Sequence, residues 1–315
     1  MPKRNSCLLP GYLTMLLSRR TLFQSSLSSL MLSGAAKASD SLDAKSQIAV
    51  TKQLISGIER KLGGRVGVSA VDTQTRLILQ WRGSERFVMH SVFKWLLSAY
   101  LLHCSDTGSR PLQTRVVIKT SSIVGHSDQT KPFVGTAITL ETLCLWMMST
   151  SDNGAANTLL DVIGGPDVLT AWLRSLGDIT TRQDTYEPGP TEGSIDPRNT
   201  TTPNAMLALT QKIWLGGVLS PRSRETLLAW LRGSAIGGHR LRAGVPSSWV
   251  EGDRTGTGDP GVANDVAIFW PDGVISGRRP ILVSSFLEGS ANDLARLEDA
   301  QASIGRILAN LFRAH

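Results

Sequence analysis

The feature that most constrains the fold is the placement of strand-like segments near the two ends of the sequence. Near the start, apolar and polar residues alternate over Arg65–Asp72 and Arg76–Trp81. Near the end, similar alternation covers Trp249–Gly256, Asp265–Trp270 and Arg279–Phe286. A period of two predicts strands with one buried face. The two groups therefore predict a single antiparallel sheet built from both ends of the chain.

Helical periodicity accounts for most of the remaining sequence. Amphipathic helices are predicted at Ser46–Leu62 and Asn292–Phe312, on either side of the strand segments. Between the two strand groups, further helices are predicted over Ser91–His103, Leu140–Met148, Gly154–Ile163, Pro166–Leu176 and Thr202–Gly216. We expect an α/β (α+β) fold: a five-stranded antiparallel sheet domain at residues 39–86 and 230–315, with an all-helical domain inserted at 87–229. Because ligand sites favour domain interfaces, a cleft is expected between the two.

The first 38 residues have the composition of an export signal. The segment from Ser18 to Gln24 (SRRTLFQ) resembles a twin-arginine motif, and a weakly apolar run from Ser25 to Gly34 follows. A small-x-small site, Ala36-Lys37-Ala38, ends the segment. The apolar run is too short and too rich in serine to remain as a membrane anchor. We expect a periplasmic or secreted protein; a disordered basic tail is the alternative.

The net charge of +7 comes mainly from this leader. Residues 1–38 hold five basic residues and no acidic one, which leaves 28 of the 33 basic residues against all 26 acidic ones. A body with nearly balanced, interspersed charge lacks the field that attracts phosphates, so no nucleic-acid partner is expected. The histidines and cysteines show no ligand spacing, so neither a metal nor another cofactor is expected.

Ser91-Val92-Phe93-Lys94 is the first motif with a chemical meaning. Serine and lysine three residues apart on a helix share a face, so the amine can accept or relay the hydroxyl proton. In the first helical turn, the serine also lies near outward-pointing N–H groups that would stabilise an oxyanion. Alone the motif indicates little, because S-x-x-K occurs by chance and Ser91 could merely cap the helix.

Two further motifs follow the first one along the sequence. Ser151-Asp152-Asn153 lies between two predicted helices, and the segment from Arg254 to Gly258 (RTGTG) lies on a predicted strand. With the first motif, they resemble the S-x-x-K, S-D-N and K-T-G set of class A β-lactamases and penicillin-binding proteins, with arginine in place of lysine. The resemblance covers residues 46 to 312. It implies the serine β-lactamase/DD-peptidase-like fold, in agreement with the periodicity, and a small-molecule β-lactam substrate.

Glu187 distinguishes a hydrolase from the other proteins that share these motifs. Tyr186-Glu187-Pro188 resembles the acidic motif on the omega loop of class A enzymes. An activated serine is enough to form an acyl-enzyme, but its release needs a base that deprotonates water, and Glu187 is the candidate. A penicillin-binding DD-peptidase would share Ser91, Lys94 and Ser151 without needing this base. A non-hydrolysing β-lactam-binding protein would lack it and would usually be tethered to a membrane or a signalling domain.

The resemblance also implies a role for each residue of the site. Ser91 is the expected nucleophile, activated by Lys94 and by Glu187 through a water, with the larger contribution left open. Ser151 is expected to pass a proton to the leaving nitrogen. Backbone N–H groups of Ser91 and Thr257 would form the oxyanion hole. Substrate binding is expected from Asn153, Arg240, Arg254, Thr255, Gly256, Thr257 and His126, and support of the omega loop from Asn157.

Two departures from the family pattern concern the omega loop. The positions that often hold an arginine–aspartate pair hold Thr185 and Asn199 here. The loop is also one residue shorter, with Pro190 or Thr191 in place of an asparagine that helps to position water. We therefore expect a more mobile loop and altered deacylation.

The cysteines beyond the leader, Cys104 and Cys144, allow one disulfide at most. The commonest bridge of the class A family joins a cysteine that matches Cys144 to one that matches Ser98 here. The resemblance therefore implies two free, buried thiols. We expect the mature protein to be a monomer.

Overall fold

Strands from both ends of the chain form one sheet in the computed structural model, which describes residues 44–190, 196–258, 261–271, 273–274 and 277–313. The chain divides into two units, Met1–Gln47 and Ile48–His315. Of the first unit, residues 44–47 are described and are helical; all other described residues belong to the second. The predicted export signal lies outside the described residues.

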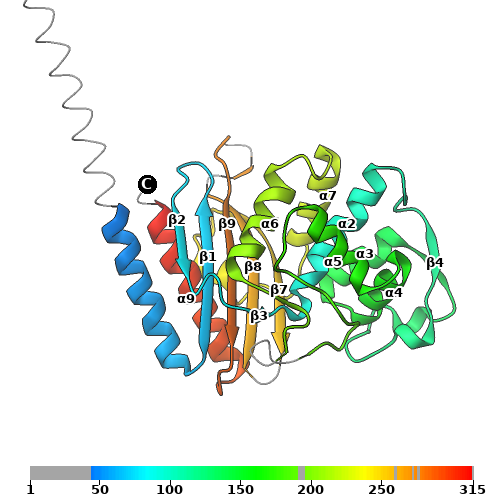
Figure 1. Cartoon of the computed structure of the whole chain (residues 1–315), viewed down its shortest axis with the longest axis horizontal. Helices are drawn as coiled ribbons and strands as arrows, with labels where there is room; N and C mark the ends of the chain where they lie inside the picture. The colour runs from blue at the N-terminus through cyan, green and yellow to red at the C-terminus, as the bar shows by residue number, and fades with distance from the viewer. Residues whose placement is uncertain (1–43, 191–195, 259–260, 272, 275–276, 314–315) are drawn as a thin grey trace, which may run out of the picture. The chain divides into compact units, whose positions relative to one another are not determined.

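The sheet pairs the first strands of the chain with the last. It contains β1 (Arg65–Asp72), β2 (Ile78–Trp81), β7 (Val250–Gly258), β8 (Val262–Trp270) and β9 (Ile281–Glu288), in the order β2-β1-β9-β8-β7 (Figure 1). Neighbouring strands are antiparallel throughout. This topology confirms the predicted fold class. Strand β7 lies at the edge that contacts the helical region.

Helices from the two ends of the second unit cover one face of the sheet. The helix over residues 48–62 and α9 (Leu294–Arg313) share an apolar cluster with Val68 of β1. Successive residues of a strand point to opposite faces, so Gly67 faces the other side. A Cβ atom at Gly67 would lie 2.4 Å from the ring of Phe87. Glycine here lets the segment that leads to Ser91 cross close to the sheet.

The other side of the sheet carries helices arranged around one buried helix, α2 (Phe93–Asp106). Around α2 lie α3 (Leu140–Thr150), α4 (Asn153–Ile163), α5 (Pro166–Ser175) and α7 (Pro221–Arg232), while α6 (Pro203–Leu215) packs on β1 and β9 (Figure 1). Their apolar side chains form one cluster with residues of β8 and β9. The helices and the sheet therefore share a continuous core, which fixes their relative position.

Short elements hold the loops of the helical region. β3 (Phe87–Val88) pairs with β6 (Thr200–Thr201), and this pair joins the segment before Ser91 to the segment after the omega loop. The remaining elements are β4 (Arg115–Val117), β5 (Ala137–Thr139), α8 (Leu241–Gly244) and the 3-10 turns His90–Val92, Thr120–Ser122 and Lys131–Phe133.

A few elements differ from the sequence-based prediction. β2 begins at Ile78 rather than Arg76, because Arg76 adopts a left-handed conformation (φ 65°) in the turn after β1. The prediction also omits α7 and α8. For α7 a signal was present: Ser220 accepts a hydrogen bond from Ser223 N, and Pro221 occupies the first turn. The predicted domain boundaries stay a prediction.

Cys104 and Cys144 are both buried and free, as the family resemblance implied. Burial raises the pKa of the Cys144 thiol. A buried thiol with a raised pKa carries little thiolate and is a poor nucleophile, so Cys144 acts as a packing side chain.

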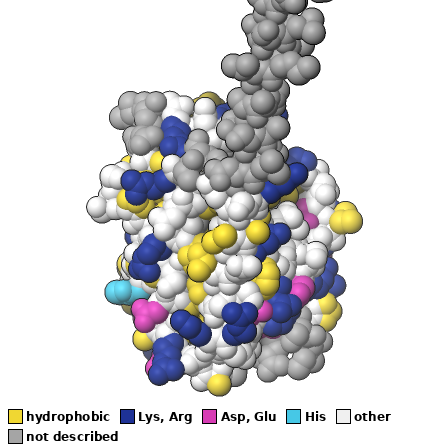
Figure 2. Space-filling view, turned by 90° about the vertical axis from the view of Figure 1, so that its left-hand side faces the viewer, with side chains coloured by type: hydrophobic (Ala, Val, Ile, Leu, Met, Phe, Trp, Pro, Cys, Tyr) yellow, Lys and Arg dark blue, Asp and Glu magenta, His cyan; other side chains and the backbone are white. Residues whose placement is uncertain are grey.

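Figure 2 views the side of the molecule on which the helix over residues 48–62 lies. A small group of hydrophobic side chains is surrounded there by Lys and Arg side chains, with Asp and Glu among them. Val50 and Leu54, one helical turn apart, are each about half exposed. Mixed charges on this face give no continuous basic surface of the kind that binds nucleic acid. Among the described residues, no helix combines the length and apolar character that crossing a bilayer requires.

Candidate active site

Ser91 lies in the one-turn 3-10 helix His90–Val92, which runs directly into α2. The backbone before it is anchored, because Met89 N donates to Asn199 O at 2.9 Å. Strand β7 approaches this turn closely: a Cβ atom on Gly256 would lie 2.4 Å from Met89 O. Gly256 was expected to bind substrate, but it is buried behind the turn and is not part of the cleft lining. Its role in the structure is to admit β7 beside the nucleophile.

Lys94 follows Ser91 by one helical turn, and its side chain is fully buried. Its Nζ donates to Ser151 O at 2.7 Å, to Ser151 Oγ at 3.1 Å and to Asn153 Oδ1 at 2.6 Å. Glu187 Oε1 lies 3.5 Å from the same nitrogen. Burial lowers the pKa of Lys94 to about 7, although the charge of Glu187 acts in the opposite direction. A lysine with such a pKa can release and accept a proton at neutral pH.

The Ser151 hydroxyl connects Lys94 to Ser91. Ser151 ends α3 in a left-handed conformation (φ 65°), which turns its side chain toward α2. Its Oγ accepts hydrogen bonds from Lys94 Nζ and, at 2.6 Å, from Arg254 Nη2. Since these donors occupy both acceptor positions, the hydroxyl proton points to Ser91 Oγ, 2.8 Å away. Ser151 is thus oriented as a proton donor toward the reacting atoms.

Asp152 holds the loop that carries Ser151 and Asn153. It caps α4, because its Oδ1 accepts hydrogen bonds from Ala155 N at 2.8 Å and from Thr130 Oγ1 at 2.7 Å. Asn153 is held at both ends of its carboxamide: Lys94 donates to its Oδ1, and its Nδ2 donates to a backbone carbonyl at 2.8 Å. The motif residues are therefore positioned before any ligand binds.

Glu187 reaches the site from the omega loop, and its side chain is 13% exposed. A single buried carboxamide holds its backbone: Asn157 Oδ1 accepts from Glu187 N at 2.8 Å, and Asn157 Nδ2 donates to Glu187 O at 3.1 Å. The next residue, Pro188, follows a cis peptide bond. Asn157 therefore lies where the sequence analysis expected a brace for the omega loop.

The base of the omega loop is closed by hydrogen bonds of Asn199, whose backbone N donates to Asp184 Oδ2 at 3.0 Å and whose carboxamide makes neutral bonds. Asn199 Oδ1 accepts from Asp184 N at 2.7 Å and from Thr185 N at 3.1 Å. Asn199 Nδ2 donates to Thr185 Oγ1 at 2.7 Å. The arginine–aspartate pair is absent, and Thr185 and Asn199 form a neutral clamp at the same two positions. The expected greater mobility of the loop stays a prediction.

These side chains surround a cleft of about 690 Å³. Of the residues predicted to bind substrate, Asn153, His126, Arg240, Thr255 and Thr257 line it. The Arg240 guanidinium is held by Gly256 O at 3.0 Å and donates to Thr257 Oγ1 at 2.5 Å. His126 is exposed, and its Nε2 lies 3.0 Å from Thr150 O. The cleft thus joins a fixed cation and two threonine hydroxyls to the reactive serine.

Arg254 lies deeper than the sequence analysis expected. It is fully buried and is not part of the cleft lining. Its Nε donates to Ser91 O at 3.2 Å and its Nη2 to Ser151 Oγ at 2.6 Å. Burial lowers its pKa to about 10, at which the guanidinium remains protonated at neutral pH. Arg254 therefore contacts the two serines directly and provides a positive charge behind them.

Asn264 is a supporting residue that the sequence analysis does not single out. Its Nδ2 donates to Val88 O at 2.8 Å, and its Oδ1 accepts from Leu287 N at 3.2 Å. It thereby ties β8 to the segment before Ser91. The available signal was an asparagine within the otherwise apolar strand Val262–Trp270.

Two buried carboxyl groups lie behind the arginines of the site. Asp253 Oδ1 accepts from Arg242 at 2.5 Å, and Asp265 Oδ2 accepts from a backbone N–H at 3.1 Å. Burial raises the pKa of both groups, and the charge of Asp253 raises that of Asp265 further.

Within the described part of the chain, no cluster of three or more His, Cys, Asp or Glu side chains is arranged to hold a metal ion.

The site contains the parts of an acyl-transfer centre. A serine hydroxyl, a lysine whose pKa lies near 7 and a second serine form one hydrogen-bonded set, and a separate carboxylate lies beside the lysine. With a five-stranded antiparallel sheet beside a helical region, this set defines the class: a serine hydrolase in which lysine assists the nucleophile.

Comparison with known proteins identifies the family. Residues 50–312 match the β-lactamase enzyme family, and the chain belongs to it as a class A β-lactamase. It is 36% identical over 260 residues to β-lactamase CTX-M-8 of Citrobacter amalonaticus, which covers 82% of this chain and 88% of that protein. It is 37% identical over 257 residues to β-lactamase L2 of Stenotrophomonas maltophilia, covering 81% and 84%.

Solved structures support the same assignment to the class A β-lactamases. An ancestral class A β-lactamase superposes with a TM-score of 0.79 at 42% identity, covering 82% of this chain and 99% of that one. A β-lactamase from Xanthomonas campestris gives a TM-score of 0.80 at 36% identity, covering 84% and 98%. The β-lactamase function predicted from the sequence is confirmed, while the roles of individual residues stay predictions.

We expect the neutral clamp to control deacylation. Asn199→Gly removes the carboxamide but tolerates the left-handed backbone of residue 199 (φ 52°), so it leaves two backbone N–H groups without their acceptor. A destabilised loop should slow deacylation by about tenfold, equivalent to about 1.4 kcal/mol. Mass spectrometry during turnover should then detect an acyl-enzyme. Asn199→Asp, which keeps the acceptor, is the control; equal turnover with no adduct in both variants would contradict the role.

The pKa of Lys94 generates a second prediction. Because the charge of Glu187 raises this pKa, Glu187→Gln should move it below about 7. The amine is neutral above its pKa, so acylation of Glu187→Gln should rise with pH and level off with a midpoint below 7. Stopped-flow measurement of the nitrocefin burst between about pH 4 and 9 gives this midpoint. A rate that falls as pH rises would exclude Lys94 as the proton acceptor.

Proposed function

We propose that this class A β-lactamase opens the β-lactam ring through an acyl-enzyme on Ser91 and hydrolyses that ester with water activated by Glu187. The observation that supports this most is the contact between Lys94 Nζ and Glu187 Oε1, at 3.5 Å, in the same buried set as both serines. A DD-peptidase or a non-hydrolysing β-lactam binder would not need a carboxylate there. Its presence favours hydrolysis over covalent capture.

In acylation, Ser91 Oγ attacks the lactam carbonyl carbon while its proton passes to neutral Lys94 or, through a water, to Glu187. The carbonyl oxygen becomes an oxyanion that accepts hydrogen bonds from Ser91 N and Thr257 N. When the C–N bond breaks, the nitrogen takes the proton of Ser151, which already points into the site. Lys94 donates to Ser151 Oγ and restores that proton. Where Glu187 took the Ser91 proton, it passes this proton to the now neutral Lys94, 3.5 Å away, and is again a carboxylate for deacylation.

In deacylation, Glu187 removes a proton from water, and the resulting hydroxide attacks the ester carbonyl carbon. The ester bond to Ser91 breaks, and Ser91 Oγ takes back the proton. Asn157 determines where this carboxylate lies, because it binds the backbone of Glu187 on both sides.

The substrate carboxylate is bound by Arg240 with the hydroxyls of Thr257 and Thr255, all of which line the cleft. Arg254-Thr255-Gly256 is the equivalent of the K-T-G motif. From its buried position, Arg254 supplies positive potential and a hydrogen bond to Ser151 rather than a direct substrate contact. Asn153 and His126 face the remaining part of the substrate.

The protein acts as a monomer in the periplasm or outside the cell, after export by a twin-arginine signal ending near Ala38. The export part of this proposal rests on the sequence of residues 18–38 alone. Amino-terminal sequencing of the exported chain tests it.

Three purified chains test the mechanism. The mature protein should hydrolyse nitrocefin, whereas Ser91→Ala should show no turnover because the nucleophile is missing. Glu187→Gln should form a covalent adduct that persists, because acylation keeps Lys94 while water loses its base. Absorbance and intact-protein mass measure the two outcomes. Full turnover by Glu187→Gln would exclude Glu187 as the deacylating base.

Arg240 provides the test of carboxylate binding. Arg240→Ala removes a charge-assisted hydrogen bond of about 1.5–3 kcal/mol, so the KM for nitrocefin should rise about 10- to 150-fold with a smaller change in kcat. The matched control is Arg296→Ala, which removes an exposed arginine from α9. Equal KM values for both variants would show that Arg240 does not bind the substrate.

A further inference from the structure

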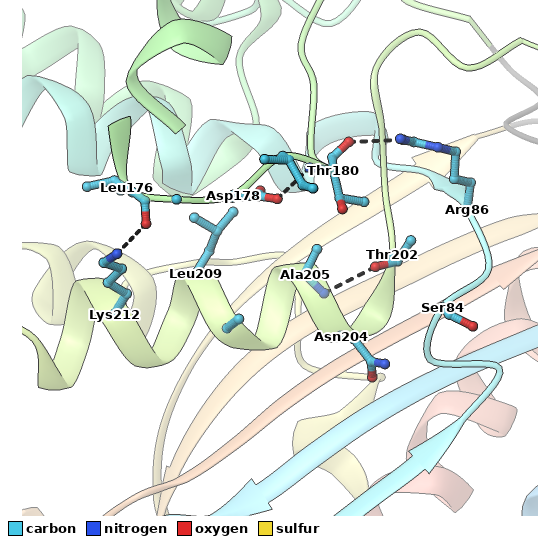
Figure 3. A pocket seen from close by; sticks show the side chains of 13 residues that line it. Ser84, Arg86, Leu176, Asp178, Thr180, Thr202, Asn204, Ala205, Leu209 and Lys212 are labelled. Atoms are coloured by element: carbon cyan, nitrogen blue, oxygen red, sulfur yellow. Dashed lines mark hydrogen bonds between the residues drawn. The ribbon is translucent and has the colours of Figure 1, made fainter. Parts of the chain in front are cut away.

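A second concave surface lies between α6 and residues 176–180, which precede the omega loop (Figure 3). This groove has a volume of about 700 Å³ and shares no lining residue with the active-site cleft. Ala205 and Leu209 of α6 form its apolar floor, and the segment from Leu176 to Thr180 forms its roof.

Two cations lie at opposite ends of the groove, as Figure 3 shows. Arg86 Nη1 donates to Thr180 O at 3.0 Å and to Thr200 Oγ1 at 2.9 Å. Lys212 Nζ donates to Leu176 O. Each cation therefore binds a backbone carbonyl of the roof.

Neither cation forms an ion pair within the part of the chain that the structure describes. The carboxylate that lines the groove, Asp178, turns to the roof backbone, where its Oδ1 accepts from Thr180 N at 2.8 Å and Thr181 N at 3.2 Å. Two positive charges thus lie at the ends of the groove without forming an ion pair with a described carboxylate.

Asn204 also lines the groove, but its Oδ1 does not bind the ligand carboxylate. This oxygen is buried with no hydrogen-bond partner among the described residues, and an amide oxygen accepts hydrogen bonds without donating them. A cavity of this size with an apolar floor and a few fixed polar groups has the usual character of a small-molecule site.

We propose that this groove binds a small organic monocarboxylate with an apolar body. The carboxylate interacts with Arg86 or Lys212, and the apolar body covers Leu209 and Ala205. A guanidinium favours carboxylates because its planar N–H groups match their geometry. Arg86 Nη1 donates to Thr180 O and to Thr200 Oγ1, while Nε and Nη2 have no acceptor among the described residues and are available to a carboxylate.

Binding in the groove is coupled to Glu187 through the roof. After Thr180, Arg182 N donates to Thr200 O at 3.0 Å, and the chain then reaches the Thr185–Asn199 clamp. A ligand carboxylate bound to Arg86 draws the guanidinium away from Thr180 O, and one bound to Lys212 competes with Leu176 O. The roof is then held less firmly, and the omega loop that it leads into samples positions unsuited to deacylation, so the ligand lowers kcat.

The binding test uses 4-phenylbutyrate as the probe and amide chemical shifts of the 15N-labelled full chain as the readout. Amides of residues 177–180 and 204–205 should shift, with a Kd on the order of 1 mM that weakens as salt is added. Arg86→Gln and Lys212→Gln should each weaken binding about fivefold or more, whereas Arg86→Lys, which keeps the charge, should weaken it less. Arg222→Gln, an exposed arginine of α7, is the control and should bind normally.

The functional test measures nitrocefin turnover with and without the probe. The probe should lower kcat in the parent chain and in Arg222→Gln, and less so in Arg86→Gln. No shift at the groove amides would overturn the proposal, as would a rise in KM alone that Arg86→Gln leaves unchanged, because the probe would then compete at the active site. The binding test needs no turnover, so its outcome is independent of the proposed catalytic roles.

Discussion

The burial of Lys94 is the interaction on which the rest of the site depends. An amino group with no exposure to solvent is stable only where polar atoms surround it. Here those atoms come from three separate segments: Ser151 at the end of α3, Asn153 at the start of α4, and Glu187 on the omega loop. The same burial lowers the pKa of Lys94 to about 7. One tertiary constraint thus joins the helices to the loop and produces a group that exchanges protons at neutral pH.

Burial also gives a reason for arginine at residue 254. The pKa of a guanidinium is ordinarily well above that of an amine, and burial lowers it at Arg254 to about 10, so the group keeps its charge at neutral pH. A lysine begins from 10.5, and burial lowers the pKa of Lys94 to about 7. A lysine at residue 254 would face the same desolvation and a neighbouring Arg240. Arginine therefore secures a permanent positive charge behind Ser151, where the charge orients the hydroxyl.

The sequence predicted the sheet and the reacting groups because both follow from local patterns: alternation over Arg65–Asp72, and short motifs around Ser91 and Ser151. It could not predict the depth of Arg254, because burial depends on the helices packed over β7. From the sequence alone, Thr185 and Asn199 indicated only that the arginine–aspartate pair of the family is absent. Their hydrogen bonds became visible only once residues 14 apart in sequence were placed side by side.

The omega loop and the segment before it are held by attachments of different physical character. At Glu187, the Asn157 carboxamide fixes the catalytic backbone, and at the base Asn199 binds Thr185 without charge. Neither attachment titrates near neutral pH, and neither is strongly weakened by salt, because no ion pair is involved. The attachments of the preceding segment, by Arg86 and Lys212, are cationic and partly open to solvent. Anions and ionic strength therefore act on the loop at that segment, and a change there reaches Glu187 only through the clamp and Asn157.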